Sequence, residues 1–128
     1  MIIKLLSLAK KYAFLLFIGC LIGIAILSLI SLGDMPDEVP EFSDKILHIL
    51  AYTVLTLLSY NYFKGLLKAN AIIFSALFSG VYGIIIEVLQ RTLNPERSFD
   101  LLDIGANIVG VGIAVILILS FKDKVKIQ

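Results

Sequence analysis

Long apolar runs separated by short polar segments dominate the pattern of this chain. Each run is about twenty residues long, which is the length that an α-helix needs to cross roughly 30 Å of hydrocarbon. Polar and apolar residues do not alternate as they do in barrel strands, and an isolated strand cannot satisfy its backbone in lipid. The pattern therefore predicts four membrane-spanning helices, at about residues 12–32, 44–63, 69–90 and 101–121.

The composition agrees with a membrane protein. Of the 128 residues, 59% are hydrophobic and 16% are charged, whereas a soluble domain carries about 25% charged residues. Mean hydropathy is +1.00. The net charge of +1 gives no basic footprint for nucleic acid, and the single cysteine, Cys20, has no partner for an internal disulfide. We expect one all-α membrane domain over residues 1–128.

Charge is unevenly distributed between the segments that join the apolar runs. Lysines lie before the first run, between the second and third, and after the fourth, whereas the segment between the first and second is acidic. The positive-inside rule places the lysine-rich side in the cytoplasm, so we expect both termini there. The apolar run continues past Cys20 to Leu32, which favours an uncleaved first helix over a signal peptide. The lysines are Lys4, Lys10, Lys11, Lys64, Lys68, Lys122, Lys124 and Lys126.

Small or polar residues recur at helical spacing within each span. Such stripes let helix backbones approach closely where lipid removes the hydrophobic driving force. They predict a compact four-helix bundle with the stripes turned inward. The stripes are Gly19 and Gly23 in the first span, Asp44, His48, Tyr52 and Thr56 in the second, Ser75, Ser79, Gly83 and Glu87 in the third, and Asp103, Asn107, Gly110 and Ala114 in the fourth.

Polar side chains gather at the outer ends of the last three spans, while the inner halves are almost wholly apolar. At about 1.5 Å per residue, His48 lies roughly 6 Å below Asp44, and Glu87 about 5 Å inside Gln90. These groups therefore share a slab of the outer leaflet, where ionisable side chains are costly and seldom idle. The set comprises Asp44, Lys45, His48, Tyr52, Glu87, Gln90, Arg91, Arg97, Asp100, Asp103 and Asn107.

The acidic members suggest a catalytic or metal-binding role. Three carboxylates close together in a medium of low dielectric cannot all ionise cheaply, so one takes a proton or a cation joins them. Histidine can carry a proton or bind a metal near neutral pH. The sequence holds one histidine and no HExxH motif, so both a catalysed reaction and a metal stay open. The candidate catalytic residues are Asp44, His48, Glu87 and Asp103.

The basic members suggest an anionic ligand. Lys45, Arg91 and Arg97 supply donors suited to phosphate, and Lys45, Arg91 or Arg97 could equally pair with Glu87. Asp100 and Asp103 are also spaced like a capping box at a helix start, a purely structural role. Basic groups at the rim with acids below suit an amphiphile with an anionic headgroup and a tail between the helices. The candidate binding residues are Lys45, Tyr52, Gln90, Arg91, Arg97, Asp100 and Asn107.

Three motifs at these residues resemble the VanZ-like family of bacterial integral membrane proteins. Together with the helix spacing, the resemblance covers about residues 44–121, and it rests on the order and spacing of the motifs rather than on any one of them. The motifs are Asp44-Lys45-x-x-His48-x-x-Ala51-Tyr52, Glu87-x-x-Gln90 and Pro95-x-Arg97-Ser98-Phe99-Asp100-x-x-Asp103-x-x-Ala106-Asn107-x-x-Gly110.

The resemblance implies a multi-pass protein of the bacterial cytoplasmic membrane with its polar site on the extracytoplasmic side. The namesake of the family is associated with resistance to the glycopeptide teicoplanin, but the family supplies no established catalytic mechanism. We expect binding or modification of an anionic envelope lipid or peptidoglycan precursor, with an effect on glycopeptide susceptibility. The alternatives are an intramembrane metal-assisted hydrolase or transferase, and a structural or partner-binding helix bundle.

Overall fold

The computed structural model describes residues 1–30, 41–93 and 101–127, with side chains described for residues 1–29, 45–93 and 101–122. Almost all of this part is helical, so the all-α prediction is confirmed. The helices begin and end close to the predicted spans. They are α1 (Ile2–Lys11), α2 (Ala13–Ile30), α3 (Glu41–Leu67), the 3₁₀ helix η1 (Lys68–Asn70), α4 (Ala71–Leu93) and α5 (Leu101–Ile127).

Two helical stretches, Lys45–Leu93 and Leu101–Lys122, are long and apolar enough to cross a membrane, or three if the bent pair α1 and α2 counts as one span. The first stretch contains α3 and α4, which reverse direction at η1, where Lys68 adopts a left-handed φ of 49°. With 27 and 23 residues, α3 and α4 are about 40 and 35 Å long, so each exceeds the thickness of the hydrocarbon. Crossing by four separate helices stays a prediction.

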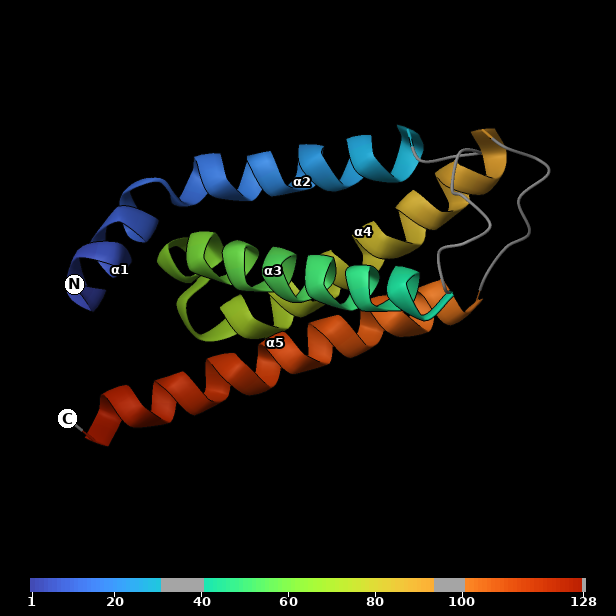
Figure 1. Ribbon diagram of the computed structural model, residues 1–128. Coiled ribbons are helices and arrows are strands. Elements are labelled where there is room, and N and C mark those ends of the chain that lie inside the picture. The colour runs from blue at the N-terminus through green and yellow to red at the C-terminus, as the bar shows by residue number, and fades with distance from the viewer. Residues whose placement is uncertain (31–40, 94–100, 128) are drawn as a thin grey trace.

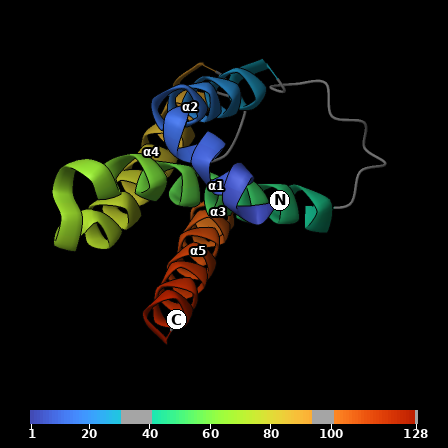
Figure 2. The same cartoon turned by 90° about the vertical axis from the view of Figure 1, so that its left-hand side faces the viewer.

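Helix α3 is the centre of the molecule. It contacts α1, α2, α4 and α5, whereas α2 and α5 make no contact with each other within the described ranges. Figure 1 shows α2 on one side of α3 and α5 on the other, and Figure 2 shows the same molecule from its left-hand end. The pairs α2–α3, α3–α5, α5–α4 and α4–α2 are all in contact, as in a four-helix bundle, and α3 also contacts α4. A bundle of four membrane spans stays a prediction.

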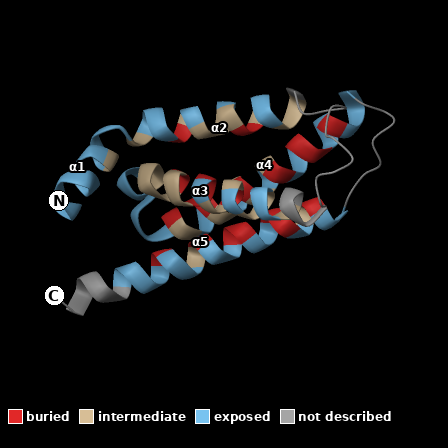
Figure 3. Cartoon of the chain, viewed as in Figure 1, coloured by how far each residue is buried: buried red, intermediate tan, exposed pale blue. Residues whose placement is uncertain are grey.

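The inward stripes of the last three helices are confirmed where side chains are described. On α4 the serines, Gly83 and Glu87 of the predicted stripe are buried, and on α5 all four stripe residues are buried. Tyr52 and Thr56 are buried on α3. The buried faces follow the sides of α4 and α5 that are turned toward the other helices (Figure 3).

The predicted stripe on the first span is wrong. Gly19 is exposed and Gly23 half-buried, and no heavy atom of another helix lies within 4 Å of where their Cβ atoms would be. Phe17 instead determines which face of α2 points toward the other helices. Its ring packs against Tyr62, Phe63 and Phe78 with centroids 5.5, 5.4 and 5.3 Å away. A large aromatic ring buries far more surface than a glycine, so it decides which face of the helix points inward.

Helices α3 and α5 approach each other closely at Gly110. A Cβ atom on Gly110 would lie 2.5 Å from the backbone oxygen of Ile49. The Thr53 hydroxyl donates to the Gly110 carbonyl at 3.0 Å and to the Ile49 carbonyl at 2.7 Å. Only a residue without a side chain fits here, and this contact aligns the N-terminal halves of α3 and α5 side by side.

Candidate functional site

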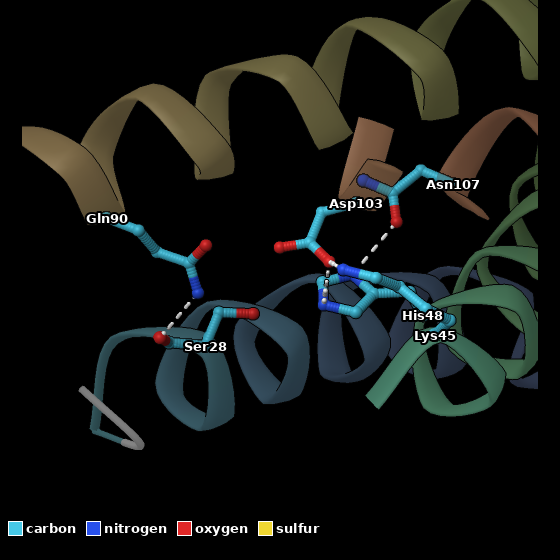
Figure 4. Close-up of polar contacts among 6 residues, drawn as sticks. All are labelled: Ser28, Lys45, His48, Gln90, Asp103 and Asn107. Atoms are coloured by element: carbon cyan, nitrogen blue, oxygen red, sulfur yellow. Dashed lines mark hydrogen bonds and ion pairs between the residues drawn. The ribbon is translucent and has the colours of Figure 1, made fainter. Parts of the chain in front are cut away.

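Four polar side chains from α3 and α5 form one cluster, which we call the α3–α5 polar cluster: Lys45, His48, Asp103 and Asn107 (Figure 4). The Lys45 ammonium donates a hydrogen bond to Asp103 Oδ1 and forms an ion pair with it. His48 Nε2 lies 3.8 Å from the same oxygen, and His48 Nδ1 lies 3.0 Å from Asn107 Oδ1. The cluster thus joins residues that are nearly sixty positions apart in the sequence.

Helical spacing and the Gly110 contact explain why these residues meet. Lys45 and His48 are three residues apart on α3, and Asp103 and Asn107 are four apart on α5, so each pair lies on one face of its helix. Gly110 follows Asn107 by three residues and lets the backbones touch. Two short side-chain ladders are therefore held opposite each other.

The cluster is buried on its acidic side and partly open on its basic side. The Asp103 side chain is 1% exposed, whereas those of Lys45 and His48 are 22% and 15% exposed. A buried carboxylate needs a charged or hydrogen-bonding partner, and removal of one partner of a buried pair is strongly destabilising. Asp103 therefore fixes the ammonium of Lys45 in place, while the basic groups remain the part of the cluster that a ligand could reach.

The hydrogen bond to Asn107 defines the chemistry of His48. An amide oxygen only accepts hydrogen bonds, so in this orientation of Asn107 the hydrogen lies on Nδ1 of the ring. Gain of a proton at Nε2 would then charge the ring, with Asp103 Oδ1 3.8 Å away as its counter-ion. The geometry thus suits a histidine that, as an imidazolium, supplies both an Nε2–H donor and a positive charge to an anionic group.

Helix α4 packs against the α3–α5 polar cluster at Asn107. A Cβ atom on Gly83 would lie 2.9 Å from Asn107 Nδ2 and 3.0 Å from Tyr52 Cε1, so both side chains rest on this glycine. Glu87, one turn further along α4, is 2% exposed. The three helices therefore bring acidic, basic and phenolic groups to the same end of the molecule.

Gln90 lies on the same face of α4 but serves a different contact. Its Nε2 donates to the Ser28 carbonyl at 2.8 Å and so ties α4 to α2. Its Oε1 is buried and has no hydrogen-bond partner among the described residues. Figure 4 shows this pair apart from the α3–α5 polar cluster. The sequence singled out Gln90, but the acceptor is a backbone carbonyl that no sequence motif marks.

The other candidates are distributed as follows. Arg91 is exposed near the end of α4, while Arg97, Asp100 and the side chain of Asp44 lie outside the described part of the chain. Lys45, which the sequence left free to pair with Glu87, pairs with Asp103. Among the described side chains, no three His, Cys, Asp or Glu residues are grouped as metal ligands would be.

At the opposite end the core is aromatic. Phe17 of α2, Tyr62 and Phe63 of α3, and Phe74 and Phe78 of α4 form a chain of ring contacts. Each of these residues belongs to the half of its helix that lies away from the α3–α5 polar cluster. The inner half thus has a core of packed rings, and the buried acidic side chains of the described residues, Glu87 and Asp103, lie at the other end.

The chain is similar to a fungal protein. An uncharacterized protein of Schizosaccharomyces pombe is 33% identical over 101 residues, which is 76% of this chain and 62% of the relative. The chain therefore spans less than two thirds of the length of that relative. No family model matches the chain, and no solved structure matches it. Membership of the VanZ-like family stays a prediction.

Proposed function

We propose that this chain is a VanZ-like membrane protein whose α3–α5 polar cluster binds the anionic, phosphate-bearing headgroup of a membrane lipid. The observation that supports it best is the partly exposed pair of basic residues, Lys45 and His48, positioned by the buried Asp103. The pair lies at one end of helices that are otherwise apolar. A lipid has the matching form, with a charged head next to long apolar tails.

The roles of the residues follow from their contacts. Asp103 and Asn107 are positioning residues, because they hold the ammonium of Lys45 and the ring of His48. The ammonium and Nε2 of His48 contact the phosphate oxygens, as donors and as positive charge. Arg91, exposed near the end of α4, adds a third basic group at this end of the molecule. The acyl or prenyl tails lie along the apolar outer faces of the helices.

The lysine distribution supports an extracytoplasmic position for the cluster. Lys64 and Lys68 lie between α3 and α4, at the end away from the α3–α5 polar cluster, and the positive-inside rule assigns that end to the cytoplasm. In a bacterium the ligand is then an envelope lipid such as a polyprenyl-linked or peptidoglycan precursor, with an effect on glycopeptide susceptibility. Because a relative occurs in a fungus, the proposal rests on headgroup chemistry and not on one bacterial lipid.

Photo-crosslinking tests the binding. The full chain is placed in nanodiscs with a photoreactive phosphatidic acid. Crosslinks within the N-terminal halves of α3 and α5 are then quantified by mass spectrometry for the wild type, for Lys45→Gln/Asp103→Asn and for Lys64→Gln. The first variant removes both charges of the pair together, so no charge is left buried alone. We expect several-fold fewer crosslinks in these halves for it and an unchanged number there for Lys64→Gln, which alters a lysine at the other end of α3. Equal labelling of all three proteins would refute the proposal.

One observation favours a second function, a structural or partner-binding helix bundle. The groups of the cluster bind one another, as expected where polar side chains serve to hold helices together. Thermal stability in detergent distinguishes the two. If the cluster is structural, the melting temperature and the crosslinking both decrease in Asn107→Ala and in Lys45→Gln/Asp103→Asn. If it binds a headgroup, the paired variant loses crosslinking while its melting temperature stays close to that of the wild type.

A further inference from the structure

The N-terminal helix α1 has no counterpart among the predicted spans. It has ten residues, about 15 Å of helix, which is half of what a membrane crossing needs. It is bent by 74° from α2. If α2 runs along the membrane normal, α1 therefore lies nearly in the plane of the membrane surface.

Helix α1 is amphipathic. At 100° per residue, Ile2, Leu5 and Leu6 fall on one side of the helix and Lys4 and Lys11 on the other, with Ile3, Leu8 and Lys10 between the two sides. The apolar side is not covered by the rest of the chain, because Ile2, Leu5 and Leu6 are 69%, 60% and 55% exposed. A short helix with an exposed apolar face and lysines opposite has the composition of an interfacial helix.

The bend of α1 is fixed by hydrogen bonds. The Asn61 side chain on α3 donates to the Ala9 carbonyl at 2.9 Å, which holds the end of α1 against the central helix. The Tyr12 nitrogen donates to the Leu8 carbonyl at 3.0 Å, and the Leu16 nitrogen to the Tyr12 carbonyl at 2.9 Å, so the backbone is paired through the turn. The angle between α1 and α2 is thus part of the fold.

The charge distribution at this end of the molecule indicates what the lysines of α1 bind. Exposed lysines of other helices lie at the same end as α1: Lys64 at the end of α3, Lys68 in η1 and Lys122 on α5 (Figure 1). Residues 1–33, 45–86 and 104–122 contain no aspartate or glutamate, and Asp123 is the one acidic residue in the segments that carry the eight lysines of this end. A surface with many more lysines than acidic residues beside an apolar face fits anionic lipid headgroups.

We infer that α1 is an interfacial anchor, with its apolar face in the boundary of the leaflet and Lys4, Lys10 and Lys11 bound to anionic headgroups. This anchor differs from the α3–α5 polar cluster, because it lies at the other end of the helices. It binds the charged surface of the bilayer and not a single lipid. It holds whether or not the polar cluster binds a headgroup.

Thiol accessibility in nanodiscs tests the anchor without depending on sidedness. In a Cys20→Ser background, Leu5→Cys reports the apolar face and Ser7→Cys the lysine face, and both are labelled with a charged, water-soluble maleimide. In discs of phosphatidylcholine with about 30% phosphatidylglycerol, we expect Leu5→Cys to react about tenfold more slowly than Ser7→Cys. In pure phosphatidylcholine, or after Lys4, Lys10 and Lys11 are changed to Gln, this ratio should fall several-fold.

Three outcomes would overturn the inference. Equal labelling of the two cysteines would place α1 in water. A ratio that is the same in neutral and anionic discs and in the glutamine variant would remove the role of the headgroups. Leu5→Cys disulfide crosslinks between two copies in detergent would assign the apolar face to a second chain.

Discussion

Replacement of Gly110 by alanine tests the contact that aligns α3 with α5. The added Cβ would lie 2.5 Å from the Ile49 carbonyl oxygen and 3.2 Å from the Thr53 nitrogen. Both are backbone atoms, so no side-chain rotation relieves the clash. The helices must separate by about 0.9 Å to reach ordinary contact. That separation breaks the 3.0 Å hydrogen bond from the Thr53 hydroxyl to the Gly110 carbonyl.

The magnitude follows from these changes. Overpacking of a well-packed interior costs about 1–3 kcal/mol, and loss of one interhelical hydrogen bond in a membrane protein costs about 0.6 kcal/mol on average. The higher helix propensity of alanine offsets up to about 1 kcal/mol. We therefore expect Gly110→Ala to lower the free energy of unfolding by about 1–3 kcal/mol. Titration with sodium dodecyl sulfate in mixed micelles, followed by circular dichroism, measures it.

Gly112→Ala is the matched control. Gly112 lies on the same helix two residues further on, is exposed, and has no heavy atom of another helix within 4 Å of its Cβ position. Its replacement should leave the free energy of unfolding within about 0.5 kcal/mol of the wild type or raise it slightly. If the two alanine variants are equally stable, α3 and α5 do not touch at Gly110 and the reasoning fails.

Two further substitutions probe the two ends of the molecule. Phe17→Ala should lower the free energy of unfolding by about 1–3 kcal/mol, less than in a soluble core because the unfolded chain stays in detergent. Phe14 is 54% exposed, so Phe14→Ala should lower it clearly less. Equal losses would contradict the assigned orientation of α2. Gly83→Ala should lower the free energy of unfolding less than Gly110→Ala does, because the added Cβ meets the side chains of Tyr52 and Asn107, which can move, and no backbone atom. A larger decrease in the same titration would be inconsistent with that packing.

Much of the fold could be predicted from the hydrophobic pattern. Runs of about twenty apolar residues have few alternatives in lipid, so the helices begin and end near the predicted residues. The inward stripes of α4 and α5 followed from helical periodicity, because their buried residues are small or polar on an otherwise apolar helix. Convergence of His48, Asp103 and Asn107 followed from the shared depth of their positions.

The remainder depends on tertiary packing. The rotation of α2 was mispredicted because glycine spacing suggested a contact, whereas the Phe17 ring found partners on two other helices. The separate helix α1 was missed because residues 1–11 are too short to cross a membrane and carry three lysines, so they have the pattern of a segment that flanks the first span. No proline or glycine marks the bend at Tyr12. The partner of Lys45 was not defined by sequence, because Glu87 and Asp103 have similar depth and only the approach at Gly110 selects Asp103.

A double-mutant cycle on Lys45 and Asp103 tests the central claim, that α3 and α5 join their polar side chains in one cluster. The free energy of unfolding is measured for the wild type, Lys45→Met, Asp103→Asn and the double variant. We expect the losses to be non-additive, with a coupling energy of about 1–3 kcal/mol, since each single change removes the same ion pair. Additive losses, with a coupling energy below about 0.3 kcal/mol, would mean that the two side chains do not meet.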